Sequence, residues 1–396
     1  ETLHASGVQA EDSLSLNLGA SLIKISSKQA QINESSTEHL VSTTDERPAI
    51  NKRPATPLNV GTQLGPSTYP APVHLSERGS PERIFTAQWE LSIERYPHLR
   101  DHCFFRQPKQ WPHLEDRFPV VPMTLSVQWV MEVAQQLADE VGQHLQVRGV
   151  QGVRAAKWIE IEPPQVVQVE AKWLSSEMIK VEIKGHLSAT VNLSTIAPTV
   201  PNLEWSAQEG ERIPPITGSQ VYAERWMFHG PAYHGIHSLS GISPHGIRGI
   251  IENKGTPGAL LDNVGQLFGL WVMLTQREDR VVMPVRLEAF KIFGPPPPLE
   301  AHLPCTVWIE SVTKREVKAR MALWYEGAIW ATCEGWSDWR FETSGSLWSL
   351  MRYPERTLFS LPLLNDQGVT LTLADHISAV ASSREFLVNE LLRREP

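Results

Sequence analysis

The chain reads VRAAKWIEIEPP over residues 153–164 and VRLEAFKIFGPP over residues 285–296, and this repetition decides the predicted fold. Each stretch opens with Val-Arg and then alternates apolar and polar residues, as a half-buried strand does. Each also closes at a proline pair, which stops a strand. We therefore predict a strand at each place, in corresponding positions of two related halves.

A predicted helix precedes each of these strands. Residues 123–142 read MTLSVQWVMEVAQQLADEVG, with apolar residues at helical spacing and Thr124 as the predicted N-cap. Residues 259–274 read ALLDNVGQLFGLWVML and follow a Thr-Pro-Gly turn. Further strand-like runs follow, at 166–174 and 178–193 in the first half and at 305–312, 316–325 and 328–336 in the second.

One helix with one antiparallel sheet leaves a sheet edge unpaired. Two such units side by side would form a continuous sheet that wraps two helices, and this is the α+β fold that we predict. The alternative is two unrelated α+β pieces, but the recurring order and spacing favour the repeat. The predicted regions are a disordered linker over 1–80, the two halves over 81–205 and 206–345, and a C-terminal extension with a linker helix over 346–396.

Composition excludes several classes of protein. The 396 residues carry a net charge of −8, whereas a nucleic-acid-binding protein would usually be basic. No uninterrupted apolar run is long enough to span a membrane, and the N-terminus does not read as a signal peptide. The chain lacks an initiator Met, so we expect it to be part of a longer one. Three widely spaced cysteines, Cys103, Cys305 and Cys333, predict neither a disulfide framework nor a zinc site and favour the cytoplasm.

Asp262 is an acidic residue within an otherwise apolar predicted helix. A carboxylate there is costly unless it faces a cavity or a partner, and Gln266 lies four residues on, on the same helix face. In an apolar pocket the carboxyl would have a raised pKa and could act as a general acid. The alternative is a first-turn acid that only favours the helix dipole.

His102 is the predicted partner of this acid. A pseudo-twofold repeat brings equivalent ends of the two helices close together, so a histidine ahead of the first helix would meet Asp262 in the second. A neutral histidine and a protonated aspartate that face one cavity form a base–acid pair suited to elimination.

Three stretches resemble the dehydratase domains of polyketide and polyunsaturated-fatty-acid synthases, in particular those of iterative, enediyne-type synthases. They are LRDH at 99–102 ahead of a proline-led helix, HGPAYHGI at 229–236 and ALLDNVGQ at 259–266. Their order is that of the family's HxxxGxxxxP, YGPxF and HPALLDxxxQ motifs, and the resemblance covers about residues 83–345. It implies a double-hotdog fold, in which each of two tandem units wraps an antiparallel sheet around a central helix.

The chain departs from the family pattern in two of these motifs. His229 occupies the tyrosine place of the second motif, and Tyr233 the phenylalanine place. In the third motif Pro257 and Gly258 replace His-Pro, while the aspartate and the glutamine are kept.

The first motif leaves two candidates for the base. His113 stands nine residues before Pro122, as in the family, but Arg117 occupies the usual glycine place. His102 has the Leu-x-Asp-His context that resembles the family's, and a longer separation from the proline. We favour His102 and keep His113 as the alternative.

The resemblance implies a lyase that dehydrates a 3-hydroxyacyl thioester to the 2-enoyl thioester within a polyketide or fatty-acid synthase. His102 would remove a proton, and Asp262 would protonate the departing hydroxyl. The substrate would be held on the phosphopantetheine of an acyl carrier protein, with no metal or redox cofactor. The partners would be that carrier protein and other domains of the synthase, with a homodimer as one candidate assembly. The predicted substrate-binding residues are Pro122, His229, Gly230, Pro231, Tyr233 and Gln266.

Two other functions keep the same fold. A product-template domain would use a His/Asp pair to direct cyclisation in a broad pocket, whereas dehydration favours a long narrow one. A catalytically inactive, dehydratase-like domain would serve only structure or dimerisation, and it is favoured if neither candidate histidine lies near Asp262.

Overall fold

The computed structural model describes residues 84–104, 114, 117–140 and 144–342, together with the backbone of residues 16–18 and 21–23. The chain forms two units, residues 1–68 with 362–371 and residues 69–361 with 372–396. In the first, β1 (Leu16–Leu18) pairs antiparallel with β2 (Ser21–Ile23). The rest of the predicted linker, and the predicted extension at 346–396, lie outside the described residues. All that follows concerns the second unit.

The first half of this unit wraps one long helix. Its helix, α1, runs from Met123 to Glu140, close to the predicted range. Its strands are β3 (Ile84–Leu91), β5 (Gln146–Ala155), β7 (Gln165–Ser175), β8 (Met178–Ile183) and β9 (Leu187–Ser194). The single run predicted at 178–193 is two strands, because Gly185, with φ 76°, allows a tight turn between them.

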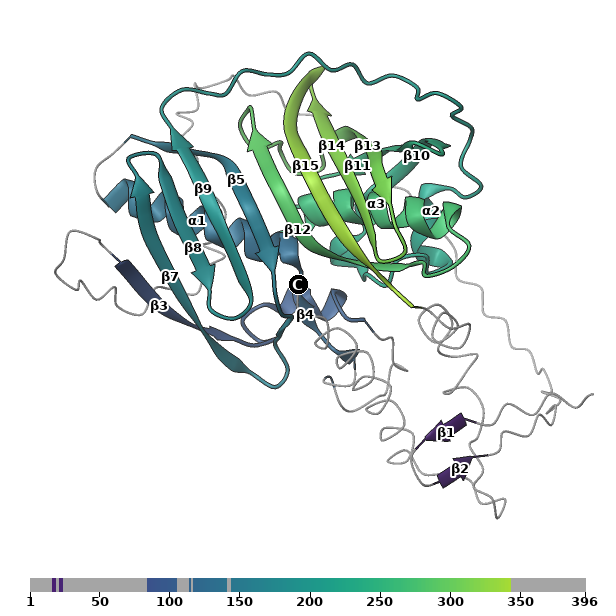
Figure 1. Ribbon diagram of the computed structural model, residues 1–396, viewed down its shortest axis with the longest axis horizontal. Helices are drawn as coiled ribbons and strands as arrows, with labels where there is room; N and C mark the ends of the chain where they lie inside the picture. Colours follow the sequence, from purple (N-terminus) through teal and green to yellow (C-terminus); the bar gives the residue numbers. More distant parts are fainter. Residues whose placement is uncertain are drawn as a thin grey trace, which may run out of the picture. The chain divides into compact units, whose positions relative to one another are not determined.

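The second half repeats this plan. Its central helix, α3, runs from Ala259 to Thr275, and a short helix, α2, from Gly218 to Ala223. The strands are β10 (Ile236–Ser243), β11 (Gly246–Glu252), β12 (Val281–Ile292), β13 (His302–Val312), β14 (Glu316–Tyr325) and β15 (Ala328–Phe341). Figure 1 shows α1 and α3 each lying against the strands of its own half.

The two repeated stretches join the halves. β12 pairs antiparallel with β5, and Arg286 lies opposite Arg154 while Leu287 lies opposite Val153. The Val-Arg motif of each half therefore meets its counterpart at the seam (Figure 1). The result is one antiparallel sheet of 11 strands, in the order β10-β11-β13-β14-β15-β12-β5-β9-β8-β7-β3. This confirms the predicted continuous sheet around two helices.

The strand predicted over 153–164 is wrong in its second part. β5 ends at Ala155, because the N–H groups of Ala156 and Lys157 turn to the carbonyl of His186. The chain then forms β6 (Ile159–Glu160), which pairs with β4 (Val120–Val121) in a separate two-stranded sheet. This small sheet holds the segment directly ahead of α1 in place.

The starts of the two helices are in direct contact. Gly258, which precedes α3, has a positive φ of 74°, and its N–H donates to the side-chain oxygen of Gln128 on α1 at 2.7 Å. A Cβ at Gly258 would stand 2.7 Å from Cα of Leu125, so only glycine allows this approach. The first turn of α3 therefore lies beside the first turn of α1.

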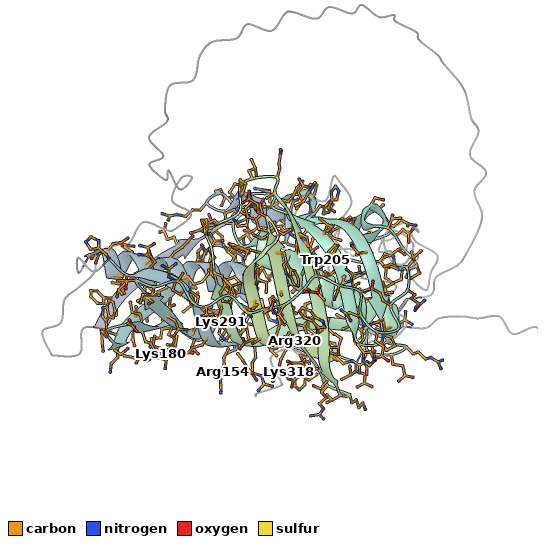
Figure 2. The ribbon with its side chains drawn as sticks, turned by 90° about the horizontal axis from the view of Figure 1, so that it is seen from above. Arg154, Lys180, Trp205, Lys291, Lys318 and Arg320 are labelled. Carbon is orange, nitrogen blue, oxygen red and sulfur yellow. The ribbon has the colours of Figure 1, made fainter. Side chains whose placement is uncertain are left out.

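Charged side chains on the sheet are paired across strands. Figure 2 labels Arg154 of β5 and Lys318 and Arg320 of β14. Nζ of Lys318 on β14 lies 2.6 Å from Oε1 of Glu288 on β12. A guanidinium nitrogen of Arg286 on β12 lies 3.0 Å from Oε2 of Glu316 on β14. Such exposed pairs each contribute only about 0–1 kcal/mol. No helix in the described part of the chain is long and apolar enough to cross a membrane.

Candidate active site

His102 is held in place through both its backbone and its side chain. It follows the 3₁₀ helix η1 (Pro97–Asp101), and its N–H donates to the carbonyl of Leu99 at 3.0 Å. The N–H of Val120 in β4 donates to the carbonyl of His102 at 3.2 Å, and Nδ1 of His102 lies 2.8 Å from the carbonyl oxygen of Val120. Because a carbonyl can only accept, Nδ1 carries the hydrogen and Nε2 keeps its lone pair.

The environment of His102 keeps its imidazole neutral. The residue is only 4% exposed. Burial lowers the pKa of His102 to about 4, and this outweighs the opposing effect of the Asp262 carboxylate. At neutral pH the ring is therefore a free base with an available Nε2, which is the form that can accept a proton.

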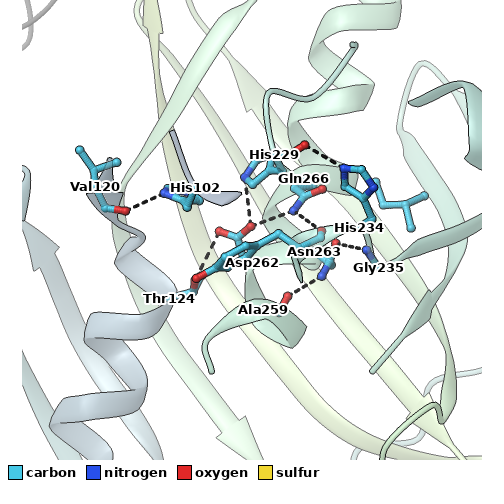
Figure 3. Close-up of polar contacts among 12 residues, drawn as sticks. His102, Val120, Thr124, His229, His234, Gly235, Ala259, Asp262, Asn263 and Gln266 are labelled. Atoms are coloured by element: carbon cyan, nitrogen blue, oxygen red, sulfur yellow. Dashed lines mark hydrogen bonds and ion pairs between the residues drawn. The ribbon is translucent and has the colours of Figure 1, made fainter. Parts of the chain in front are cut away.

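Asp262 lies in the first turn of α3, and three side chains in the described part of the chain are its polar partners (Figure 3). Gln266, one turn further on, donates from Nε2 to Oδ2 of Asp262 at 2.8 Å. Nε2 of His229 lies 3.1 Å from the same oxygen, and Oγ1 of Thr124 on α1 lies 3.4 Å from Oδ1. The predicted role of Thr124 as an N-cap is wrong, since α1 begins one residue earlier and the hydroxyl faces the carboxylate.

His102, His229 and Asp262 converge on one point. One nitrogen of each imidazole and one carboxylate oxygen all lie within 4.8 Å of one another. His102 comes from the first half, and the other two residues come from the second, so the repeat does bring the two halves' polar groups together. Two imidazoles and one carboxylate at this spacing could also hold a transition-metal ion.

The pKa of Asp262 differs from the sequence-based expectation. Burial alone would raise it, as we predicted for an apolar pocket. The imidazoles of His229 and His102, with the hydrogen bonds from His229 and Gln266, outweigh burial and lower the pKa of Asp262 below its usual value. The expected rise in the pKa of Asp262 was wrong. The apolar residues around Asp262 in the sequence predict that it is buried, but they do not predict that a distant loop places His229 beside it.

The loop that carries His229 is tied to the residue next to His102. The N–H of Gly230 donates to the carbonyl of Asp101 at 2.7 Å, and the N–H of Ala232 donates to Oδ2 of Asp101 at 2.8 Å. A Cβ at Gly230 would overlap the Asp101 side chain, so glycine permits the approach. This loop includes the 3₁₀ helix η3 (Pro231–Tyr233).

The predicted substrate-binding residues divide between the site and its surroundings. The ring of Tyr233 is fully buried, with its centroid 5.3 Å from that of His102. Gln266 and His229 contact Asp262 directly, as described above. Pro231 is exposed, and Pro122 is buried at the start of α1, where its carbonyl accepts the N–H of Leu125. Their roles in substrate binding stay predictions, and the alternative base His113 lies outside the described residues.

Two supporting residues escaped the sequence analysis. Tyr222 of α2 donates from its hydroxyl to Oε1 of Gln266 at 3.0 Å, which turns the Gln266 amide nitrogen towards Asp262. Asn263 is fully buried, and its Oδ1 accepts the N–H of Gly235 at 2.8 Å. The only sequence signal for Asn263 was a second polar residue in an apolar helix, and for Tyr222 there was none.

The arrangement can exchange protons at two positions. Nε2 of His102 is a neutral base, and the carboxyl of Asp262, in contact with a second imidazole, is an acid or its conjugate base. Both groups are largely buried, in surroundings that strengthen electrostatic interactions. A base and an acid so close together can remove a proton from one carbon and protonate a group that leaves its neighbour.

No protein-family model matches the chain, and no curated protein matches it. Several solved structures do. The dehydratase domain of the CurF module of the curacin polyketide synthase matches with a TM-score of 0.53 and 15% identity, over 69% of this chain and 99% of that one. The CurJ module's dehydratase domain matches with a TM-score of 0.51 and 14% identity, over 69% and 98%.

The dehydratase domain of a mycocerosic acid synthase-like polyketide synthase matches the chain about as well as the two curacin domains do. It matches with a TM-score of 0.51 and 14% identity, and the match covers 70% of this chain and 99% of that domain. At such identities the likeness concerns the fold alone. The chain therefore has the double-hotdog fold of the polyketide synthase dehydratase domains.

Proposed function

We propose that this chain dehydrates a 3-hydroxyacyl thioester to the 2-enoyl thioester. The observation that carries the proposal is the convergence of His102, from the first half, and Asp262, from the second, within 4.8 Å in a buried site. The double-hotdog fold supports it, and the neutral state of His102 supplies the base that elimination needs.

In the proposed reaction Nε2 of His102 takes the proton from C2, which is acidified by the thioester carbonyl. The C–H electron pair becomes the C2–C3 double bond as the C3–O bond breaks. The hydroxyl takes a proton from the protonated form of the Asp262 carboxyl, a strong proton donor because its pKa is lowered, and leaves as water. His102 is then protonated, and Asp262 is a carboxylate stabilised by Gln266 and Thr124. Return of the proton from His102 to Asp262 restores the starting state.

We propose that the substrate is carried on the phosphopantetheine arm of an acyl carrier protein, within a multidomain polyketide or fatty-acid synthase in the cytoplasm. Proton transfer at two side chains requires no metal or redox cofactor. The substitution of a histidine for the family's tyrosine at position 229 does not break this scheme, since Nε2 of His229 lies 3.1 Å from a carboxylate oxygen of the acid.

The test is mass spectrometry of 3-hydroxyacyl pantetheine thioesters of several chain lengths, incubated with the 396-residue chain. We expect loss of water with the wild type and, in reverse, hydration of the 2-enoyl thioester. His102→Gln and Asp262→Asn should each abolish both reactions, while His144→Gln, at an exposed histidine, should retain them. An inactive wild type on every substrate, or an active His102→Gln variant, would overturn the proposal or its assignment of the base.

A further inference from the structure

We infer that His229 is a third catalytic residue and that it shares with Asp262 the proton that the departing hydroxyl receives. This inference rests on the proposed dehydration. It assigns the acid to a pair of side chains rather than to a lone carboxyl, and it gives His229 a part in proton transfer instead of substrate binding alone.

The contacts around Asp262 single out His229. Among the described residues, three side chains lie within hydrogen-bond distance of the carboxylate: Gln266 at 2.8 Å, His229 at 3.1 Å and Thr124 at 3.4 Å. An amide and an alcohol can donate hydrogen bonds, but neither gives up a proton near neutral pH. An imidazole can both take up and release a proton, so His229 is the member of this set that can exchange a proton with Asp262.

Burial makes that exchange effective. The side chains of His229 and Asp262 are only 6% and 12% exposed. A proton placed between them is therefore kept from bulk water, and an ionised pair of imidazolium and carboxylate is closely neutralised. The pKa of Asp262 is lowered chiefly by the imidazole of His229 against the opposing effect of burial, so within the pair the proton resides on the imidazole rather than on the carboxyl.

The second nitrogen of His229 provides a further indication. Nδ1 is buried and has no hydrogen-bond partner among the residues that the structure describes. Buried polar atoms are generally paired, and a substrate oxygen would pair with this one. His229 thus offers one nitrogen to Asp262 and another to a polar guest, and the ring lies beside His102 with a centroid distance of 5.1 Å.

The proton balance is simple. Before the reaction the pair holds one proton and His102 is neutral. During elimination His102 gains the proton from C2, and the pair gives its proton to the hydroxyl, which leaves as water. Afterwards His229 is neutral, Asp262 is ionised, and transfer of one proton from His102 to the pair resets the site.

His229→Gln tests this assignment. Glutamine can still donate a hydrogen bond to Asp262, but it cannot store a proton. We expect kcat to fall about a hundredfold or more, which is the usual contribution of general acid catalysis, with an unchanged melting temperature. The basic limb of the pH–kcat profile should move, because the proton would then be held by a carboxyl whose pKa is set by burial instead of by the carboxyl–imidazole pair.

Two outcomes would overturn the inference while leaving the proposed dehydration intact. They are a His229→Gln variant with wild-type kcat, or one with a lower kcat and an unshifted basic limb, which would make His229 a positioning residue. Failure of the proposed function itself looks different, since the wild type would then be inactive as well.

A separate group of side chains carries a second inference. We propose a transition-metal site at His237, Glu252 and His302, for an ion such as Zn²⁺. One ligand atom of each residue lies within 4.8 Å of the other two, and the two rings have centroids 4.2 Å apart. Two imidazoles with one carboxylate suit zinc, nickel and copper ions.

The sheet arranges these three residues. They stand on adjacent strands β10, β11 and β13, and Glu252 lies directly opposite His302 in the β11–β13 pairing. His237 and His302 are exposed, so small rotations of their rings could bring the ligand atoms to about 3.4 Å, the separation in a tetrahedral zinc site. Lys254 lies 2.9 Å from Glu252 and would compete with the ion for the carboxylate.

Calorimetric titration with ZnCl₂ tests this site, on the His229→Gln background so that the buried histidine pair does not contribute. His237→Gln and His302→Gln should each weaken binding at least tenfold, while His144→Gln should not. Lys254→Gln should tighten binding, because the competing ammonium is gone. Equal affinity in all of these variants, or the absence of binding in the background chain, would refute the site.

Discussion

The carboxylate of Asp101 accepts the N–H of Ala232 at 2.8 Å, although 131 residues separate the two in the sequence. The carbonyl of Asp101 accepts the N–H of Gly230 as well. The residue directly before the proposed base thus fixes the loop that brings His229 to the proposed acid, and one aspartate sets the relative position of both. This couples the first half of the fold to the second at the site itself.

Replacement of Asp101 by alanine should loosen this loop. We expect kcat to fall about tenfold to a hundredfold, because small displacements of catalytic groups are costly. Asp101→Asn should keep most of the activity, since its side-chain oxygen can still accept the N–H of Ala232. Steady-state kinetics of both variants provide the measurement, and similar losses in the two would show that the charge of Asp101 matters rather than its hydrogen bond.

The neutral state of His102 predicts the acidic limb of the pH–rate profile. Burial holds the pKa of His102 at about 4, so the base is protonated, and activity is lost, only as the pH falls through that region. If the base were a histidine with an unperturbed pKa, the enzyme would lose activity near pH 6.5. The measurement is kcat/KM between pH 4 and 8, within the range where circular dichroism shows an intact fold. An acidic limb near pH 6.5 would mean that another histidine acts as the base.

The contact between the two helix starts makes Gly258 a sensitive position. Gly258→Ala would add a Cβ at 2.7 Å from Leu125 Cα and force a positive φ of 74° on alanine. We expect a loss of about 2 kcal/mol or more in the free energy of unfolding, by clash and backbone strain together.

Gly269→Ala, within α3 itself, is the matched control. Its added Cβ would meet only the methyl groups of Met227 and Val282, both at 3.6 Å, and alanine favours a helix by up to about 1 kcal/mol over glycine. Urea unfolding should therefore show Gly269→Ala as neutral or stabilising. If both variants lose the same stability, the close approach of α3 to α1 at Gly258 is not what matters.

The sequence was sufficient for those features that depend on local patterns. Apolar spacing predicted α1 and α3 nearly to the residue, and the repeated Val-Arg stretches predicted the strands that meet at the seam, β5 and β12. The spacing of Asp262 and Gln266 placed both on one helix face, where they do form a hydrogen bond. Helical and strand periodicity is encoded within a few residues, so a single sequence reveals it.

Features set by distant contacts were missed. β6 interrupts the predicted strand because it pairs with β4, which lies about 40 residues earlier in the chain. The pKa of Asp262 changes direction because His229 lies beside it, and Tyr222 orients Gln266 from another helix. Each depends on which segments pack together, and tertiary context of this kind overrides local preference.

Asp338 of β15 is a second buried carboxyl, and it predicts an unusual dependence of stability on pH. It is 3% exposed, and Nε1 of Trp336 donates to its Oδ1 at 2.7 Å. Burial raises the pKa of Asp338 to about 7, against the weaker opposing effect of that hydrogen bond. In the unfolded chain an aspartate has a pKa of about 3.9.

Between about pH 4 and pH 7 the folded chain therefore binds more protons at Asp338 than the unfolded chain does. Protonated Asp338 therefore contributes to stability below pH 4. This contribution is lost as the pH rises to about 7, and the free energy of unfolding falls by on the order of 2–4 kcal/mol.

Asp338→Asn keeps an oxygen for Trp336 and cannot ionise. Urea unfolding should show this variant more stable than the wild type at pH 8 and no more stable at pH 5. The buried His102 gives a slope of opposite sign, but it is common to both proteins and cancels in the difference. A difference in stability that does not change between pH 5 and pH 8 would mean that Asp338 is already ionised in the folded protein at pH 5.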